Sequence, residues 1–178
     1  MIRTRVGYAG GTKKNPTYHD LGDHTESFQV DFDPEKTSYA DLLAIVWDSH
    51  NPCAQSWSRQ YRSAIFYAND DQKKLALESK AKVEKERGKV TTDIEPLGTF
   101  TWAEDYHQKY SLRNSRELAK EFKSMFAKDE DFVNSTAAAR VNGYLGGDGT
   151  KEQLEKEVDR LGLSDEGKKV LKTRVGDR

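Results

Sequence analysis

The chain has 178 residues, with 29 Lys and Arg against 30 Asp and Glu, a net charge of −1 and one cysteine. A charge this close to zero creates no basic field of the kind that attracts phosphate backbones, so we predict no nucleic-acid partner. A single cysteine excludes an internal disulfide and a four-cysteine zinc module. The content of 35% hydrophobic and 10% aromatic residues excludes a wholly disordered chain.

Signals for membranes or export are missing from the sequence. No run approaches the roughly 20 apolar residues of a membrane-spanning helix, so we predict no membrane partner. Residues 1–6 hold two arginines without an apolar run after them, unlike a signal peptide, and the expected location is the cytoplasm. The first predicted strand starts at the second residue without a lead-in. We interpret this abrupt start as a sign that an upstream segment is missing.

The first 37 residues are expected to contain two strands. Period-two alternation of apolar and polar residues predicts strands over 2–8 and 28–32. Gly10-Gly11 predicts a turn after the first strand, and a long polar loop follows over 12–23.

Helices and strands then alternate. Ser38 has the features of an N-cap and predicts a helix that ends near His50, before Pro52. The elements expected next are a strand over 63–67, a helix from Asn69-Asp70 to Arg87 that Gly88 stops, a weaker strand over 90–97, and helices over 104–110 and 116–126. This order predicts an α+β fold with a two-layer core of sheet and helices.

The composition changes after residue 128, and we divide the chain into a domain over 1–128 and a tail over 129–178. Residues 142–149 are rich in glycine and predict a turn and linker. Thr150 as N-cap, with Gln153 at the capping-box position, predicts a helix, and a further short helix is expected within 163–175. The tail is therefore predicted to be a helical appendage of two helices.

Cys53 follows His50 by three residues and is a candidate nucleophile, because a neighbouring imidazolium stabilises a thiolate. The alternative is a bystander thiol in a loop, which spacing alone favours. Zinc ligation by Cys53 is disfavoured because the histidines lie in separate segments, and we predict no metal. The glycines of residues 7–11 lack the spacing of a phosphate-binding loop and are interpreted as a tight turn.

Seven motifs follow one another along residues 7–110. In chain order they are Gly7-Tyr8-Ala9-Gly10-Gly11-Thr12, Asn15-Pro16-Thr17-Tyr18, His24-Thr25-Glu26, Ser38-Tyr39 with Asp41-Leu42-Leu43, His50-Asn51-Pro52, Gln60-Tyr61-Arg62-Ser63-Ala64-Ile65, and Ala103-Glu104-Asp105-Tyr106-His107-Gln108-Lys109-Tyr110. Together they resemble the peptide methionine sulfoxide reductase A family, in one collinear match from the first residue to about residue 110.

The resemblance implies an enzyme that reduces the S-epimer of methionine sulfoxide, free or in oxidised proteins, as protein repair under oxidative stress. In the family, a cysteine of a Gly-Cys-Phe-Trp motif attacks the sulfoxide sulfur and becomes a sulfenic acid, which external thiols reduce. The implied partners are oxidised proteins or free methionine sulfoxide and a thiol reductant such as the thioredoxin or glutathione system. No bound cofactor is implied, and we expect a monomer with the family's sheet-and-helix core.

Three residues match the family's hydrogen-bond donors to the sulfoxide oxygen: Tyr18, Glu26 and Tyr61. The sulfoxide oxygen gains basicity as sulfur is attacked, so two phenols and a protonated carboxyl are suited to stabilise it. We expect Glu26 to lie in an aromatic-lined pocket, where desolvation favours its protonated form.

Two features depart from the family pattern. The Gly-Cys-Phe-Trp motif is absent, and Ser56-Trp57-Ser58-Arg59 stands where the family has an aspartate before its Gln-Tyr-Arg motif. The chain is interpreted either as a truncated reductase or as a protein that lost its nucleophile. In the second case it binds methionine sulfoxide without catalysis or uses Cys53. We expect little or no turnover by these 178 residues.

Overall fold

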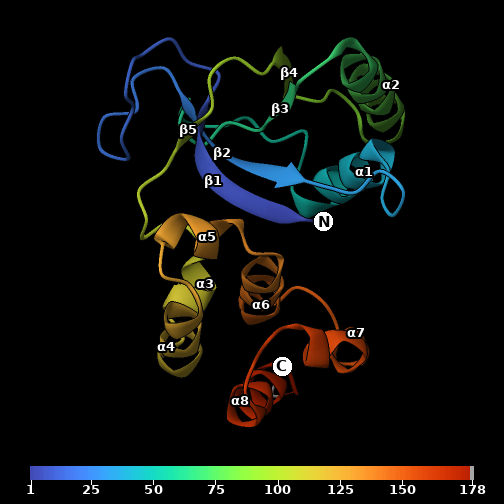
Figure 1. Ribbon diagram of the computed structural model, residues 1–178. Helices are drawn as coiled ribbons and strands as arrows, with labels where there is room; N and C mark the ends of the chain where they lie inside the picture. The colour runs from blue at the N-terminus through green and yellow to red at the C-terminus, as the bar shows by residue number, and fades with distance from the viewer. Residues whose placement is uncertain (177–178) are drawn as a thin grey trace. The chain divides into compact units, whose positions relative to one another are not determined.

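The computed structural model describes residues 1–176 (Figure 1). They form two compact units, which we call the sheet unit and the helical unit. The sheet unit is Val6–Ala103, and the helical unit combines Met1–Arg5 with Glu104–Arg178, of which residues 177 and 178 lie outside the described part. Helices and strands occur together in the chain, which confirms the predicted α+β fold class.

Within residues 1–176, five strands form two small sheets. They are β1 (Arg3–Ala9), β2 (Thr25–Asp31), β3 (Ala64–Tyr67), β4 (Asp93–Pro96) and β5 (Thr101–Trp102). The first sheet has the order β2-β1-β5, and the second is the parallel pair β3-β4. In the antiparallel pairing of β1 with β5, Gly7 lies opposite Trp102. A Cβ at Gly7 would meet the backbone oxygen of Thr101, so glycine allows β5 to approach.

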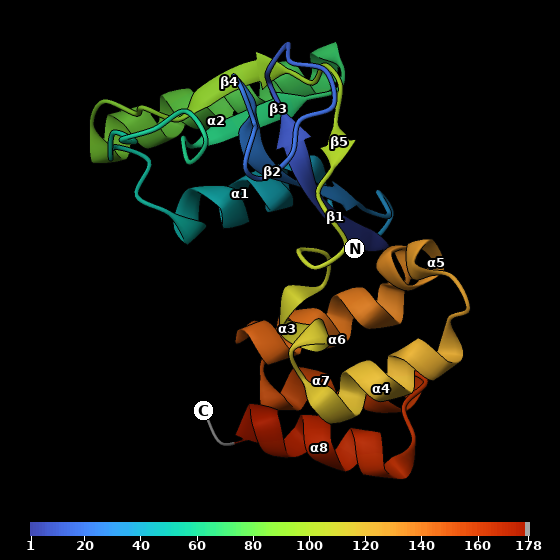
Figure 2. The ribbon, with the colours of Figure 1, turned by 90° about the vertical axis from the view of Figure 1, so that its left-hand side faces the viewer.

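The helix α2 (Asp70–Arg87) packs on the β3-β4 pair, and α1 (Tyr39–Ser49) packs on α2 (Figures 1 and 2). The predicted caps are confirmed. Ser38 forms a capping box with Asp41, and Asn69 accepts from the backbone N–H of Gln72. The two helices, β3 and Val90 together form one buried apolar cluster. Its members are Leu43, Trp47, Ile65, Ala76, Val83 and Val90.

The helical unit contains, in chain order, α3 (Tyr110–Arg113), α4 (Arg116–Met125), α5 (Asp129–Asn134), α6 (Thr136–Gly146), α7 (Lys151–Glu157), the 3-10 helix η1 (Val158–Arg160) and α8 (Asp165–Gly176). Each of these elements contributes to one hydrophobic core, whose members include Leu112, Leu118, Phe122, Val133, Val141, Leu154, Val158 and Leu171. The predicted capping box between Thr150 and Gln153 is present at the start of α7.

Two predictions for this unit are wrong. The helix expected over 104–110 is a series of turns, in which His107 and Gln108 donate backbone N–H groups to carbonyls three residues earlier. The linker expected over 142–149 is occupied by α6 as far as Gly146, because Val141 and Tyr144 are buried in the core and hold the segment helical.

The tail also differs from the prediction in extent. Four α-helices, rather than two, lie in the described part of the chain after residue 128. The structure groups residues 104–128 with this tail. The domain boundary at 128/129 stays a prediction.

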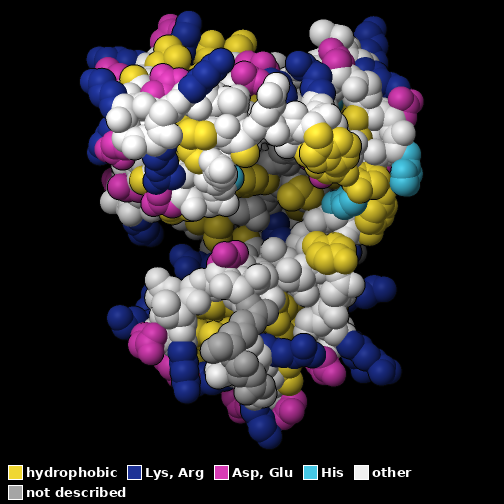
Figure 3. All heavy atoms as spheres, turned by 180° about the vertical axis from the view of Figure 1, so that it is seen from behind, with side chains coloured by type: hydrophobic (Ala, Val, Ile, Leu, Met, Phe, Trp, Pro, Cys, Tyr) yellow, Lys and Arg dark blue, Asp and Glu magenta, His cyan; other side chains and the backbone are white. Residues whose placement is uncertain are grey.

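Hydrophobic side chains reach the surface among charged ones on the face that Figure 3 shows. The exposed aromatic residues include Phe28, Trp57, Tyr61, Tyr106 and Tyr110. Within residues 1–176, no helix is both long and apolar enough to cross a membrane.

Candidate functional site

The three predicted oxygen-binding residues belong to one hydrogen-bonded cluster in the sheet unit. Tyr18 lies in the loop between β1 and β2, Glu26 on β2, and Tyr61 in the segment before β3. Gln60 joins two of them, because its side-chain amide donates to Glu26 Oε1 at 2.6 Å and to the Tyr61 hydroxyl at 3.1 Å. A side-chain hydrogen bond joins Tyr61 to Tyr18. The structure therefore brings together residues separated by up to 43 positions in the chain.

The protonation of Tyr61 is stabilised within this cluster. The hydrogen bond with Tyr18 raises the pKa of Tyr61, and desolvation and the charges of Tyr18 and Glu26 add to the effect. The Gln60 amide acts in the opposite direction, because it donates to the phenol oxygen. A phenol with a raised pKa keeps its proton at neutral pH, so Tyr61 can act as a hydrogen-bond donor.

The cluster is accessible from solvent. Tyr61 is 45% exposed, and the Tyr18 ring is half-buried against Tyr8 and Leu21. The Glu26 side chain is exposed, so the expectation that it lies in a desolvating aromatic pocket is wrong. Trp57 is 84% exposed, and its ring lies 5.3 Å from the Tyr61 ring.

Asp23 closes the loop that carries Tyr18. Its carboxylate accepts from the Thr12 backbone N–H at 2.8 Å, the Thr12 hydroxyl at 2.9 Å and the Lys13 N–H at 3.1 Å. These bonds, led by the one from the Thr12 backbone, hold the pKa of Asp23 well below its usual range. The carboxylate thus stays ionised, and the two ends of the loop remain joined, at neutral pH.

Gly11 and His24 pack closely together where the same loop begins and ends. A Cβ at Gly11 would come within 2.6 Å of the His24 ring, and Gly10 adopts a positive φ of 73°. His24 is 2% exposed, and its Nε2 lies 2.8 Å from the Lys13 carbonyl oxygen. Gly7 belongs to β1, and the chain bends at Gly10, directly after this strand, where the turn was expected.

Arg62 connects the cluster to the second sheet. Its Nε donates to Thr25 Oγ1 at 2.8 Å, and its two terminal nitrogens each donate to a Glu95 oxygen at 2.6 Å. This pair lowers the pKa of Glu95, with the Arg62 hydrogen bonds as the main cause. The sequence analysis assigned no role to Gln60 or Arg62. Both belong to the Gln60-Tyr61-Arg62 motif, which was the signal that could have identified them.

Cys53 lies apart from this cluster. Its thiol donates to the Arg87 carbonyl at 3.4 Å and lies 4.0 Å from the Gly88 carbonyl, at the C-terminal end of α2. None of the hydrogen bonds described for residues 1–176 joins Cys53 to Tyr18, Glu26 or Tyr61. The proposed role of Cys53 as a nucleophile stays a prediction.

His50 has both ring nitrogens engaged. Nδ1 lies 2.7 Å from the Val46 carbonyl and Nε2 lies 2.9 Å from Thr92 Oγ1. The imidazole is therefore held at the end of α1 by contacts other than Cys53. Among residues 1–176, no group of three or more His, Cys, Asp or Glu is placed to hold a metal ion.

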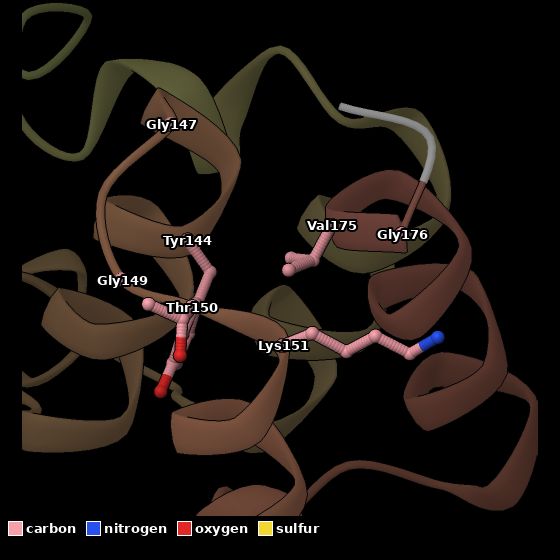
Figure 4. A pocket seen from close by; sticks show the side chains of 7 residues that line it. All are labelled: Tyr144, Gly147, Gly149, Thr150, Lys151, Val175 and Gly176. Atoms are coloured by element: carbon pink, nitrogen blue, oxygen red, sulfur yellow. The ribbon is translucent and has the colours of Figure 1, made fainter.

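The helical unit contains a hollow of about 240 Å³ between α6, α7 and α8 (Figure 4), lined by Tyr144, Gly147, Gly149, Thr150, Lys151, Val175 and Gly176. Burial raises the pKa of Tyr144 to about 12, and its hydroxyl donates to Glu157 at 2.7 Å. This phenol is thus engaged with its own unit and stays protonated.

Two family models of known proteins together match residues 1–175 of the chain. A family model described as peptide methionine sulfoxide reductase matches residues 1–141, and a second, described as selenoprotein methionine sulfoxide reductase A, helical domain, matches residues 127–175. The chain is 38% identical over 167 residues to peptide methionine sulfoxide reductase from Drosophila melanogaster, covering 92% of this chain and 67% of that protein.

Two further comparisons agree. The chain is 36% identical over 171 residues to peptide methionine sulfoxide reductase A5 from rice (Oryza sativa subsp. japonica), covering 90% of this chain and 66% of that protein. Among solved structures, the reduced form of Mxr1 from Saccharomyces cerevisiae superposes with a TM-score of 0.57 and 27% identity, covering 62% of this chain and 70% of the yeast chain. The chain thus spans about two thirds of the length of the fly and rice relatives.

Proposed function

Because the chain belongs to the peptide methionine sulfoxide reductase family, we propose that Tyr18, Glu26 and Tyr61 bind the sulfoxide oxygen of methionine-S-sulfoxide and support its reduction to methionine. The observation that carries this proposal is the single hydrogen-bonded cluster in which Gln60 links Glu26 to Tyr61, and Tyr61 contacts Tyr18. Its exposure suits a substrate as large as an oxidised protein, as well as the free amino acid.

The cluster would act on the oxygen as its charge develops. When sulfur is attacked, electron density moves onto the oxygen, and donors already aimed at that atom stabilise it. Tyr61 supplies a phenol proton that its raised pKa retains, and Tyr18 supplies a second. Gln60 donates to Glu26 Oε1 and to the Tyr61 hydroxyl, and so holds the Glu26 carboxyl group beside Tyr61.

The reaction balances with thiols alone. A thiol sulfur attacks the sulfoxide sulfur, the S–O bond and the transient S–S bond then break, and the oxygen ends bonded to the thiol sulfur as a sulfenic acid. Methionine sulfoxide is thereby reduced by two electrons to methionine, and the thiol is oxidised by two electrons. Two further thiols convert the sulfenic acid back to a thiol with release of one disulfide and water. We propose that the thioredoxin or glutathione system supplies these thiols in the cytoplasm, and that the protein acts as a monomer without a bound cofactor.

The attacking group is separate from the oxygen-binding residues. The printed sequence contains no Gly-Cys-Phe-Trp motif, and the recorded contacts of Cys53 lie at the end of α2. We propose that the 178 residues alone turn over little or no substrate, and that a thiol in a Gly-Cys-Phe-Trp segment confers turnover. Residues 127–175 match a helical domain named for a selenoprotein, so a selenol is a candidate for the same role.

A second candidate function follows from the position of Cys53. A chain whose only thiol lies outside the oxygen-binding cluster can bind methionine sulfoxide without reducing it. In this role the protein would recognise oxidised methionine as an interaction module.

Turnover of methionine-S-sulfoxide with dithiothreitol distinguishes these proposals. The assay compares the printed chain, its Cys53→Ser variant, and a chain extended before Met1 by a segment with the Gly-Cys-Phe-Trp motif. We expect activity in the extended chain alone. Activity of the printed chain that is lost in Cys53→Ser would instead make Cys53 the nucleophile, and an inactive extended chain that still binds sulfoxide would support the binding module.

A further inference from the structure

We propose that Arg59 is a positioning residue, which holds the loop of Tyr18 beside the segment of Tyr61 and so sets the spacing of the two phenols. This inference rests on the proposed function of the cluster. Arg59 belongs to the segment Ser56-Trp57-Ser58-Arg59, which stands where the family has an aspartate before its Gln-Tyr-Arg motif.

The Arg59 guanidinium bridges the two ends of the Tyr18 loop. Nε donates to the Asp23 carbonyl at 2.7 Å, and a terminal nitrogen donates to the Gly10 carbonyl at 3.1 Å. Gly10 precedes the loop and Asp23 ends it, so one planar group fixes both ends. The fork of the guanidinium makes this bridge possible, whereas a lysine ammonium is a single point charge on a flexible stem.

The loop between these ends is internally braced. The Asp23 carboxylate accepts from Thr12 and Lys13, and Lys13 forms an ion pair with Asp20. The backbones of Thr17 and Asp20, on either side of Tyr18, are joined by two hydrogen bonds of 3.0 and 3.3 Å. Because the loop is braced in this way, a shift at its ends is transmitted to Tyr18.

The backbone at Arg59 is itself anchored to β2. Its carbonyl accepts from Thr25 Oγ1 at 3.1 Å, and the next carbonyl, of Gln60, accepts from the Glu26 N–H at 3.0 Å. Gln60 then holds Glu26 and Tyr61 with its side chain. One short segment therefore fixes Glu26 and Tyr61 directly, and Arg59 adds Tyr18 to the same frame.

An ordinary structural arginine of the sheet unit provides the matched control. Arg87 donates to the Trp47 carbonyl at 2.9 Å and to Asp48 at 2.8 Å, so it also bridges two acceptors on another segment. Its partners lie on α1 and have no recorded contact with the oxygen-binding cluster. Replacing Arg87 removes a bridge of similar chemistry without touching the loop of Tyr18.

The test compares the full chain with Arg59→Met, Arg59→Lys and Arg87→Met. NMR titration gives the dissociation constants of methionine-S-sulfoxide and of methionine, and thermal unfolding confirms that each variant is folded. We expect Arg59→Met to weaken sulfoxide binding about tenfold while methionine binding is unchanged, so that the selectivity for sulfoxide falls. Arg59→Lys should lose most of the same selectivity, and Arg87→Met should keep that of the wild type.

A folded Arg59→Met with the wild-type selectivity would overturn the inference and leave the proposed function standing. If Arg59→Met does not fold, the ratio of the two dissociation constants is measured for Arg59→Lys and decides in its place. A wild-type chain without preference for the sulfoxide would instead contradict the proposed function. In that case, nuclear Overhauser contacts between the Tyr18 and Tyr61 rings test the positioning role of Arg59. Loss of these contacts in the Arg59 variants but not in Arg87→Met supports this role. Their retention in the Arg59 variants refutes it.

Discussion

Lys109 is a buried cation whose recorded acceptors are neutral. Its side chain is 4% exposed, and Nζ donates to the Thr4 carbonyl at 2.6 Å and to Thr4 Oγ1 at 3.2 Å. Burial lowers the pKa of Lys109 from 10.5 to about 8, and the charges of Arg5 and Arg113 contribute. The ammonium form is therefore disfavoured in the folded helical unit.

The direction of the pH effect follows from proton binding. Between about pH 8 and pH 10.5 the unfolded chain holds the proton on Lys109 while the folded chain has released it, so the free energy of unfolding rises with pH. Below pH 8 both states are mainly protonated, and the buried ammonium lowers the free energy of unfolding by a constant amount of about 3 kcal/mol. About 2 kcal/mol of it is regained between pH 7 and pH 9.5.

We predict that Lys109→Met removes this pH dependence. The assay is denaturant unfolding of wild type and variant at pH 7 and at pH 9.5, followed by the helix signal. Relative to the variant, the wild type should gain about 2 kcal/mol at the higher pH. The backbone of Lys109 has a φ of 53°, and methionine leaves its left-handed strain unchanged because it retains the Cβ.

The control is Lys172→Met, which removes an exposed lysine of the same unit that pairs with Glu155. This variant should follow the wild-type pH dependence. A wild-type advantage over Lys109→Met that stays constant from pH 7 to pH 9.5, or that shrinks, would refute the reasoning from burial.

Two further predictions concern the frame of the sheet unit. Arg62→Met should lower the free energy of unfolding by about 2 kcal/mol in denaturant titrations, because Glu95 loses its two-point partner; no change would contradict a structural role for this pair. Gly11→Ala should destabilise the unit by about 1–3 kcal/mol, since the new Cβ would come within 2.6 Å of the His24 ring. Gly98→Ala, where nothing lies within 4 Å, is the matched control, and equal effects of the two alanines would contradict the packing argument.

Local signals in the sequence account for much of the fold. Ser38 and Asn69 cap the helices that they predict, and Gly88 follows the end of α2 with a φ of 93°. These predictions hold because a cap is made between residues only three or four positions apart. The short strand β5 was not predicted, since its two residues carry no periodicity and are defined by pairing with β1.

The errors arise where contacts distant in sequence decide the outcome. Glycines at 143 and 146 favour a linker locally, yet α6 includes both because Tyr144 and Val141 are buried in the helical core. Burial supplies more free energy than helix propensity removes at a glycine. The extent of α6 was therefore not readable from its own residues.

The candidate site was predicted only in part, because some of its contacts join residues that are distant in sequence. The motif order identified Tyr18, Glu26 and Tyr61, and the structure brings them into one cluster. Sequence spacing could not reveal that Gln60 joins Glu26 to Tyr61, or that the Cys53 thiol contacts the end of α2, because these contacts span 34 positions.

The central claim is that the cluster recognises the sulfoxide oxygen. Its most direct test is the binding of methionine-S-sulfoxide and of methionine to the chain and to its Tyr18→Phe/Tyr61→Phe variant, measured by calorimetry. We predict that the wild type binds the sulfoxide at least about tenfold more tightly than methionine, and that loss of the two phenol donors abolishes this preference. Equal affinities of the wild-type chain for the two ligands, or an unchanged preference in the double variant, would contradict the account.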